Sequence, residues 1–136
     1  MLLSRIKKSQ TILKTKNMKK EIAEIWIKEL ESGKYKQTKG VLKKDDSYCC
    51  LGVLCQISGL GEFKQLLGDE IISYVLPSGN LSSAALPDEV LDWSDIEDQY
   101  GSFDESDSFS TLSILNDSGK TFTEIAEIIR QNYKAL

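Results

Sequence analysis

Residues 48–59 read YCCLGVLCQISG, and this stretch contains all three cysteines of the chain. One side of it carries apolar residues at spacings of three and four, which is the period of a helix: Cys50, Val53, Leu54 and Ile57. The residues between them are also largely apolar, and a helix that is apolar nearly all round is buried. Gly52 leaves room for another stretch of backbone, and Gly59 is a helix stop. The stretch therefore predicts a buried central helix.

The cysteines also raise the question of metal or thiol chemistry. Cys49 lies at the predicted helix start, where a helix dipole favours a thiolate. However, the chain has no histidine and no Cys-x-x-Cys pair, and adjacent cysteines rarely reach one tetrahedral metal ion. A nucleophilic thiol would lack its usual activating base. We therefore expect no metal, no cofactor and no catalytic residue here, and we interpret the cysteines as small buried apolar side chains.

The composition is typical of one soluble domain. The 136 residues are 40% hydrophobic and 28% charged, and a chain of this length buries a core without disulfide or metal staples. No apolar run approaches the roughly 18 residues of a membrane span, and the first residues are too polar for a secretory signal. We expect a cytoplasmic protein without a membrane partner.

The charge is unevenly distributed along the chain. Residues 1–44 hold 13 of the 17 basic and 4 of the 21 acidic residues, a net +9, whereas residues 45–136 carry a net −13. A basic first third suits phosphate groups, and an acidic remainder repels long nucleic acid. The alternative is that the two parts neutralise each other in the fold or across an oligomer.

The central stretch is flanked by two amphipathic helices. Residues 1–17 are weakly patterned and are interpreted as an N-terminal arm, and residues 18–136 as a single globular domain. Lys19 to Ser32 is predicted to be a helix whose inward face carries Ile22, Ile25, Trp26 and Leu30, with Ile27 to the side. Thr121 and Glu124 form a capping box that begins the last helix.

The remaining segments are short. We predict strands at Tyr35 to Leu42, near Tyr48 and at Ile71 to Leu76, a turn at 43–47, a helical turn at 62–68, short helices from Pro87 to Trp93 and from Thr111 to Asn116, and an exposed acidic loop at Ser94 to Ser110. The predicted fold class is α+β: a single small domain of about four to five helices packed on a small antiparallel sheet.

Two nucleotide-related motifs are incomplete. SGKT at 118–121 matches only the tail of a phosphate-binding loop, since the first glycine is missing. LNDSGKTFTEIAEII at 115–129 is similar to the opening of a helix-turn-helix, but only seven residues follow Ile129, too few for a recognition helix. We expect no sequence-specific nucleic acid partner. What remains is a helix start at which Asn116, Asp117 and Thr121 can hold an anion or a ribose, or simply cap the helix.

A second group of polar and aromatic residues surrounds the predicted hairpin. Aromatic rings stack on bases and lysines bind phosphate. The candidates for this role are Tyr35, Gln37, Lys39, Lys43 and Tyr48, with Trp93 as a further ring. The alternative, equally consistent with the sequence, is a solvated strand edge guarded by lysines.

Four sequence blocks together resemble a family of small phage and prophage proteins. They are SGKYKQTKGVL (32–42), YCCLGVLC (48–55), LPDEVLDW (86–93) and LNDSGKTFTEIAEII (115–129). The resemblance runs from about Met18 to Tyr133. It implies a phage origin, location in the infected host's cytoplasm and an accessory role, but no reaction, because most such proteins have no assigned activity.

We therefore expect a phage anti-defence protein that sequesters a small nucleotide-derived immune signal, such as a cyclic ADP-ribose or a cyclic dinucleotide, without catalysis. We also expect a homo-oligomer, since small pockets are often completed across symmetric interfaces. Two alternatives stay open. One is an inhibitor that binds a host defence enzyme through the acidic loop, and the other is a phosphodiesterase that cleaves the signal without histidine.

Overall fold

The computed structural model describes residues 17–66 and 70–136. Its helices are α1 (Lys20–Glu31), α2 (Cys50–Ser58), α3 (Asp88–Ser94), α4 (Leu112–Asp117) and α5 (Phe122–Asn132), followed by a 3₁₀ turn at Tyr133–Ala135. Its strands are β1 (Lys36–Gln37), β2 (Lys43–Lys44), β3 (Ser47–Tyr48), β4 (Glu62–Gln65), β5 (Ile72–Val75) and β6 (Leu81–Ser82). The α+β prediction is confirmed, with two three-stranded sheets instead of one.

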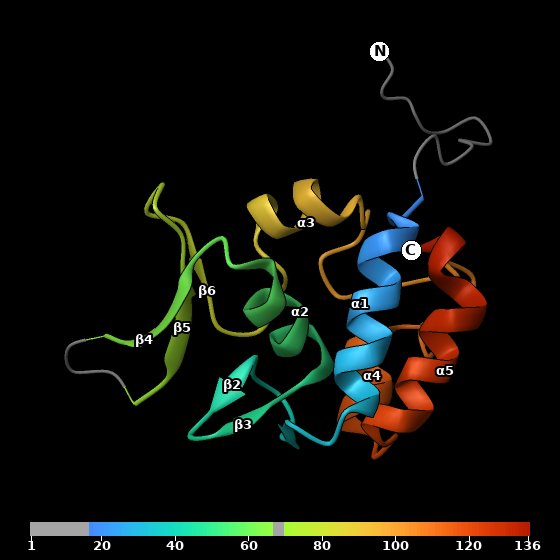
Figure 1. Cartoon of the computed structure of the whole chain (residues 1–136), viewed down its shortest axis with the longest axis horizontal. Helices are drawn as coiled ribbons and strands as arrows, with labels where there is room; N and C mark the ends of the chain where they lie inside the picture. Colours follow the sequence, from blue (N-terminus) through green and yellow to red (C-terminus); the bar gives the residue numbers. More distant parts are fainter. Residues whose placement is uncertain (1–16, 67–69) are drawn as a thin grey trace, which may run out of the picture.

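Helix α2 lies at the centre, with the α1–α5 pair on one side and the strands on the other (Figure 1). The Sγ atom of Cys49 accepts a hydrogen bond from the Gly52 backbone N–H at the start of α2, and Gly59 ends the helix with φ of 65°. Five of its residues have no exposed surface: Cys50, Leu51, Val53, Leu54 and Cys55. The prediction of a buried central helix is confirmed.

Gly52 allows a neighbouring segment to touch the helix backbone. A Cβ atom at this position would lie 1.9 Å from the carbonyl oxygen of Leu42. The same oxygen accepts a hydrogen bond from the Cys49 backbone N–H at 3.1 Å. The chain just before β2 is therefore fixed against the first turn of α2, and the predicted backbone approach is confirmed.

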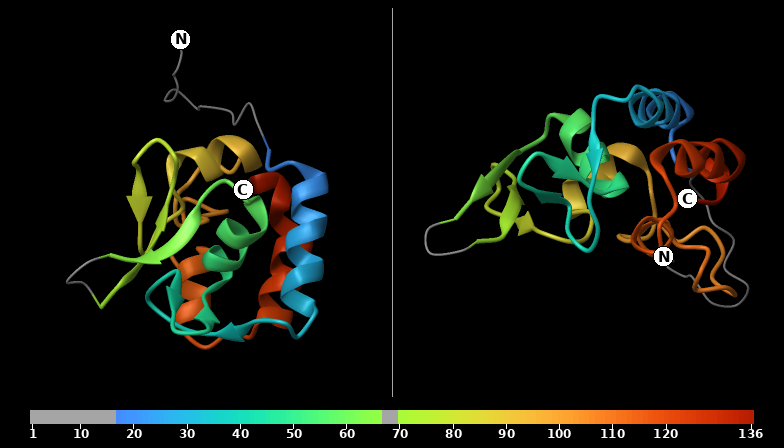
Figure 2. Two further views of the ribbon diagram at one scale, coloured as in Figure 1. Left: turned by 60° about the vertical axis from the view of Figure 1, so that its left-hand side comes forward. Right: turned by 90° about the horizontal axis from the view of Figure 1, so that it is seen from below.

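Helix α1 is tied to α2 through Trp26, whose indole N–H donates a hydrogen bond to the Cys50 carbonyl oxygen at 3.0 Å. The prediction that Ile25 faces the core is wrong, because its side chain is 51% exposed, whereas Ile27 is buried. Helix α1 packs against both α2 and α5. Its buried face is therefore centred between these two neighbours, and for this reason Ile27 is buried while Ile25 is exposed. Figure 2 shows α1 beside α5.

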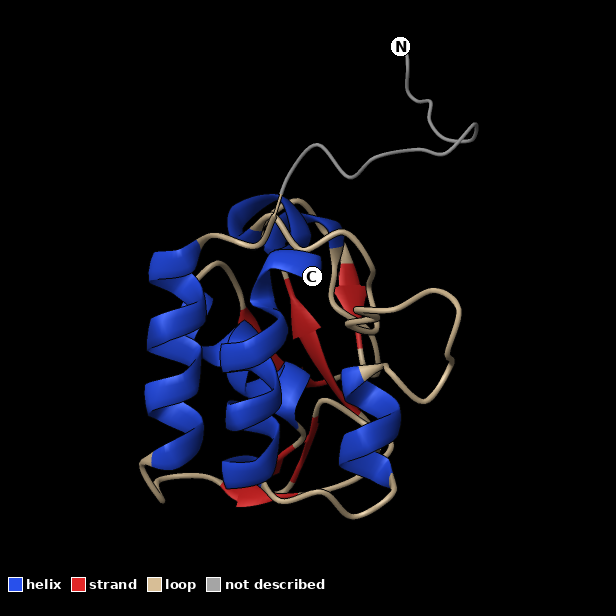
Figure 3. Cartoon of the chain, turned by 90° about the vertical axis from the view of Figure 1, so that its right-hand side faces the viewer, coloured by secondary structure: helices blue, strands red, loops and turns tan. Residues whose placement is uncertain are grey.

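The first sheet has the strand order β1-β3-β2, and it is mixed. Strands β2 and β3 form a hairpin around a turn at Asp45, whose φ is 52°. The strand predicted at 35–42 is wrong except for β1, and the turn predicted at 43–47 is shorter, because residues 43–44 and 47 belong to β2 and β3. Strand β1 pairs with β3 in parallel, with Gln37 beside Tyr48. In Figure 3 most of the helices face the viewer, and several strands lie behind or beside them.

The second sheet, β4-β5-β6, is antiparallel. Strand β5 confirms the strand predicted at 71–76. The helical turn predicted at 62–68 is wrong for residues 62–65, which form β4, while 67–69 lie outside the described residues. Phe63 pairs with Tyr74 across the strands, with ring centroids 4.8 Å apart. Such cross-strand aromatic pairs stabilise sheets, and β4 is a strand because of this pairing and not because of a pattern in its own four residues.

The acidic segment after α3 is a loop, as predicted. Its aspartates accept hydrogen bonds from nearby backbone N–H groups, as when Asp98 binds the amides of Tyr100 and Ser102. Pro87 precedes α3 as its N-cap. None of the helices within 17–66 and 70–136 combines the length and apolar character needed to cross a bilayer. Apart from Asn17, the predicted N-terminal arm lies outside the described residues.

Candidate functional site

Four aromatic rings form a continuous row between the two sheets. Tyr35 and Tyr48 meet edge to face with centroids 5.2 Å apart, Tyr48 and Phe63 with centroids 5.7 Å apart, and Phe63 then contacts Tyr74. Tyr74 is buried, and its hydroxyl accepts from the Gly61 backbone N–H at 2.7 Å. The other three rings are half-buried. The row therefore runs from the core to the surface.

Lys43 lies over the outer part of this row. Its ammonium nitrogen is 5.1 Å from the centroid of Tyr48 and 5.7 Å from that of Phe63, within the range of a cation–π interaction. The sheet register explains the contact, since Lys43 pairs directly with Tyr48 across β2 and β3 and directly opposed residues share a face. We call Tyr35, Lys43, Tyr48 and Phe63 the aromatic–lysine site.

Three of these residues were predicted from the sequence, and Phe63 was missed. The segment Glu62–Gln65 contains one apolar residue and no alternation that would indicate a strand, and it was interpreted as a helical turn. The hydroxyl of Tyr35 donates a hydrogen bond to Glu29 Oε1 at 3.2 Å. Burial, and secondly the Glu29 carboxylate, raise the pKa of this hydroxyl, so it remains a donor.

Lysines without a carboxylate partner surround the site. Among the described residues no ion pair involves Lys36, Lys39, Lys43 or Lys44, whereas Lys34 pairs with Glu29 at 3.0 Å. Lys36 and Lys44 both pair with Ser47, one from each neighbouring strand. They therefore lie on the sheet face opposite to Lys43, so the two faces of this small sheet both carry uncompensated positive charge.

Asn116 lies at a different kind of position. It has no exposed surface, and its Oδ1 accepts hydrogen bonds from the Gln37 side chain at 2.8 Å and from the Cys50 backbone N–H at 3.1 Å. Its Nδ2 donates to the Thr38 carbonyl at 2.8 Å and to Asp117 Oδ1 at 3.2 Å. These contacts use its full bonding capacity. Asn116 and Gln37 thus join β1, α2 and α4 to one another.

The other residues predicted near this helix start have local partners. Asp117 Oδ1 accepts from the Gly40 backbone N–H at 2.9 Å, which holds the loop that carries the exposed Lys39. Thr121 forms the predicted capping box, in which its hydroxyl accepts from the Glu124 backbone N–H at 3.1 Å. This arrangement favours positioning and capping roles, the alternative that the sequence left open.

Trp93 is not part of the aromatic–lysine site. It lies in α3, and α3 and the β2–β3 hairpin occupy opposite sides of α2 (Figures 1 and 2). The backbone carbonyl of Trp93 accepts a hydrogen bond from the Lys19 ammonium at 2.9 Å. The structure therefore separates Trp93 from Tyr35 and Tyr48.

The cysteines are held as neutral thiols. Burial raises the pKa of Cys49 to about 11 and raises the pKa values of Cys50 and Cys55 as well. All three are unpaired and buried. Within the described part of the chain, no three Cys, Asp or Glu side chains are grouped as metal ligands. The buried thiols give no support to nucleophilic chemistry, because the thiolate is the reactive form.

Comparison with known proteins gave one match. A family model described as "Domain of unknown function (DUF8296)" matches residues 18–133, nearly the whole range of the chain. No curated protein and no solved structure matches.

Proposed function

Because the chain belongs to the family described as Domain of unknown function (DUF8296), whose description assigns no activity, we propose its function from the site. The protein binds a small nucleotide-derived ligand at the aromatic–lysine site and sequesters it without cleaving it. In the narrower form of the proposal, the ligand is an immune signal of the cyclic ADP-ribose or cyclic dinucleotide type, and the protein serves a phage against its host's defence.

One observation carries the proposal: Lys43 lies over the half-buried Tyr48 and Phe63 rings with no carboxylate partner in the described chain. A nucleotide needs a ring to stack against and a cation near its phosphate. The site supplies both within one sheet face. Lys39 follows β1, is exposed and has no ion pair among the described residues, so it adds positive charge to the loop after this strand.

Sequestration fits the chemistry of the surrounding groups better than catalysis. The thiols are buried and protonated, and the chain has no histidine. A carboxylate that acts as a general base must reach the reacting atoms. The carboxylate of Glu29, which contacts the site, is bonded to Tyr35 and Lys34. These features support a ligand that is held and released intact.

The test is ligand retention by the pure protein. The protein is incubated with cyclic dinucleotides, cyclic ADP-ribose isomers, ATP and NAD, filtered, and then denatured, and the released compounds are identified by mass spectrometry. Release of an intact nucleotide at a stoichiometric amount is the expected result. A cleaved product would indicate a phosphodiesterase, and retention of none of the compounds would contradict the proposal.

Adjacent lysines provide a matched comparison for the position of the site. Lys43→Ala removes the cation over the rings, whereas Lys44→Ala removes a cation from the opposite face of the same strand. We expect about a tenfold or larger loss of affinity for Lys43→Ala, because a charge-assisted contact contributes about 1.5–3 kcal/mol, and little change for Lys44→Ala. The reverse result would indicate that the ligand binds on the other face of the sheet.

A second candidate function rests on Phe109. Its side chain is 70% exposed in the acidic loop. It lies between Asp107 and Ser110, whose side chains are hydrogen-bonded to each other. An exposed aromatic residue within acidic surroundings is suited to a basic protein surface with an apolar pocket. A host enzyme that copurifies with the wild-type protein but not with Phe109→Ser would favour this inhibitor role over ligand sequestration.

A further inference from the structure

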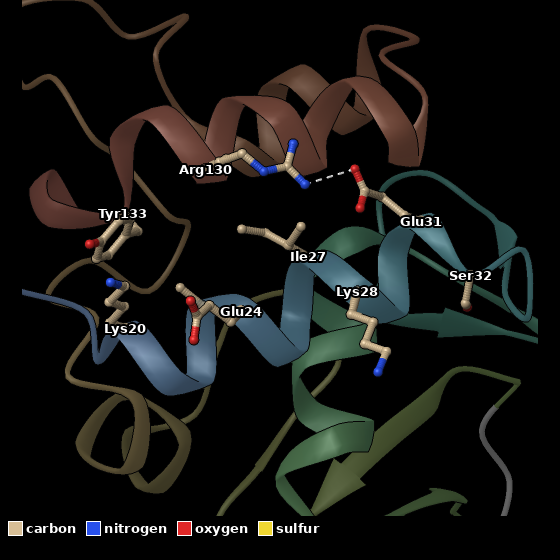
Figure 4. Close-up of a pocket in the computed structure, with 9 residues that line it drawn as sticks. Lys20, Glu24, Ile27, Lys28, Glu31, Ser32, Arg130 and Tyr133 are labelled. Atoms are coloured by element: carbon tan, nitrogen blue, oxygen red, sulfur yellow. Dashed lines mark hydrogen bonds and ion pairs between the residues drawn. The ribbon is translucent and has the colours of Figure 1, made fainter.

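Helices α1 and α5 run side by side in opposite directions, and a groove of about 730 Å³ follows their outer surface (Figure 4). Ala23 and Ile27 form its floor, and both are nearly closed off from solvent. Arg130 and Tyr133 of α5 form one wall. This groove is on the helical side of the molecule, away from the strands that carry the aromatic–lysine site (Figure 1).

The α1 residues along the groove lie on one side of the helix. Lys20, Glu24, Ile27 and Glu31 follow one another at intervals of four, three and four, and all four line the groove. Residues at these intervals lie along one side of a helix, so these four side chains follow the groove from one end of α1 to the other. In the described chain no helix covers the open side of the groove (Figure 4).

The charges along α1 alternate in a self-complementary order. From the amino end, the charged lining residues of α1 are Lys20, Glu24, Lys28 and Glu31, which is plus, minus, plus, minus. Reading the same helix backwards gives minus, plus, minus, plus. Two copies of α1 placed antiparallel therefore bring Lys20 opposite Glu31 of the partner, and Glu24 opposite Lys28 of the partner. A parallel arrangement would put like charges opposite each other.

We infer that this groove is an interface between two copies of the chain, which pair through antiparallel α1 helices about a two-fold axis. A two-fold interface uses the same patch on both copies, so every favourable pair occurs twice. Ala23 and Ile27 lie beneath this contact as the floor of the groove, and the charged pairs above them join the two copies. Arg130 donates a hydrogen bond to Glu31 at 3.0 Å and so holds this carboxylate at the groove, where it meets the partner's Lys20. The interface is independent of the proposed ligand site.

A charge-swap series tests the interface, with oligomeric state measured by sedimentation and light scattering. The wild type is expected to form a dimer. Lys28→Glu places like charges opposite each other at two symmetric positions, and so does Glu24→Lys. Each single reversal should raise the dimer dissociation constant about tenfold or more, since two pairs of roughly 0.5–1 kcal/mol are lost and replaced by repulsion. The double variant Glu24→Lys/Lys28→Glu restores opposite charges and should restore the dimer.

The double variant separates an interface effect from a folding effect, because it contains both substitutions. Lys44→Glu, a reversal on β2 far from the groove, is the control and should leave the dimer unchanged. Three results would overturn the inference: a monomeric wild type at the highest soluble concentration, a dimer insensitive to both single reversals, or single reversals that dissociate it without recovery in the double variant.

Discussion

Gln37 donates a hydrogen bond from its side-chain amide to Oδ1 of Asn116 at 2.8 Å, although the two residues are 79 positions apart. The same oxygen accepts from the Cys50 backbone at the start of the central helix. One buried amide thus fixes β1, the central helix α2 and helix α4 relative to one another. The contact also determines where the neighbouring Tyr48 lies, because Gln37 and Tyr48 are paired across β1 and β3.

Replacing Asn116 should therefore lower the stability of the whole domain. Asn116→Ala leaves the Cys50 N–H and the Thr38 carbonyl without partners, and we expect a loss of about 2–4 kcal/mol in the free energy of unfolding, measured in urea. Asp117→Ala, at an exposed neighbour, should cost under about 1 kcal/mol. A variant of Asn116 that keeps full stability but loses ligand retention would show direct binding in place of a positioning role.

Gly52→Ala should be strongly destabilising. The added Cβ would lie 1.9 Å from a backbone oxygen, and a main-chain atom cannot move aside as a flexible side chain can. We expect a loss of about 3 kcal/mol or more in a denaturant titration, or failure to fold. Gln56→Ala, an exposed position in the same helix, serves as the control. A mild effect of Gly52→Ala would mean that Leu42 is not fixed against α2.

The buried thiol of Cys49 should make stability depend on alkaline pH. Its ordinary pKa is 9.0 and burial raises it to about 11, so the unfolded chain loses this proton first. The contribution is fully present below pH 9, and the free energy of unfolding then falls by about 1.4 kcal/mol per pH unit up to about pH 11.

Cys49→Ser isolates this effect from that of the lysines and tyrosines that titrate in the same range. Serine also accepts a hydrogen bond at a helix start but does not titrate there. The difference in unfolding free energy between wild type and Cys49→Ser should therefore change with pH between about 9 and 11. A constant difference across this range would contradict the burial of the thiol.

Tyr48 should act through its ring and not through its hydroxyl. Tyr48→Phe retains the contacts to Tyr35, Lys43 and Phe63 and should keep nucleotide retention, whereas Tyr48→Leu should weaken it about tenfold, as expected for one lost stacking contact of about 1–3 kcal/mol. Thermal melting of both variants checks that the domain remains folded. Equal losses in the two variants would indicate a hydroxyl contact.

Thr121 offers a separate test of capping. Thr121→Ala removes the side-chain acceptor at the start of α5 and should cost about 1 kcal/mol, while Thr121→Ser should be close to neutral. Thr123→Ala, at an exposed position in the first turn of the helix, is the control. Loss of ligand retention in Thr121→Ser with unchanged melting temperature would instead assign the threonine to the binding site.

The helical elements were largely predictable from local pattern. The buried stretch around Cys50, the capping box at Thr121 and the stop at Gly59 each depend on residues within one or two turns. The aromatic–lysine site was predictable only in part. Tyr35, Lys43 and Tyr48 were identified because they flank a hairpin, whereas Phe63 enters through a strand that is recognisable only by its pairing with β5.

The sequence by itself determined that a cysteine-containing helix is buried and that polar and aromatic residues gather around the hairpin. Helix burial follows from residue type and periodicity, which are local properties. Only the tertiary structure decided that Asn116 is fully bonded, that Trp93 lies across α2 from the site, and that Ile27 instead of Ile25 faces inward. These outcomes depend on which elements pack together. Helix α1 packs on both α2 and α5, and this second neighbour shifts its buried face. The bonding capacity of Asn116 is used by groups that are distant in the sequence, such as Gln37 and Cys50.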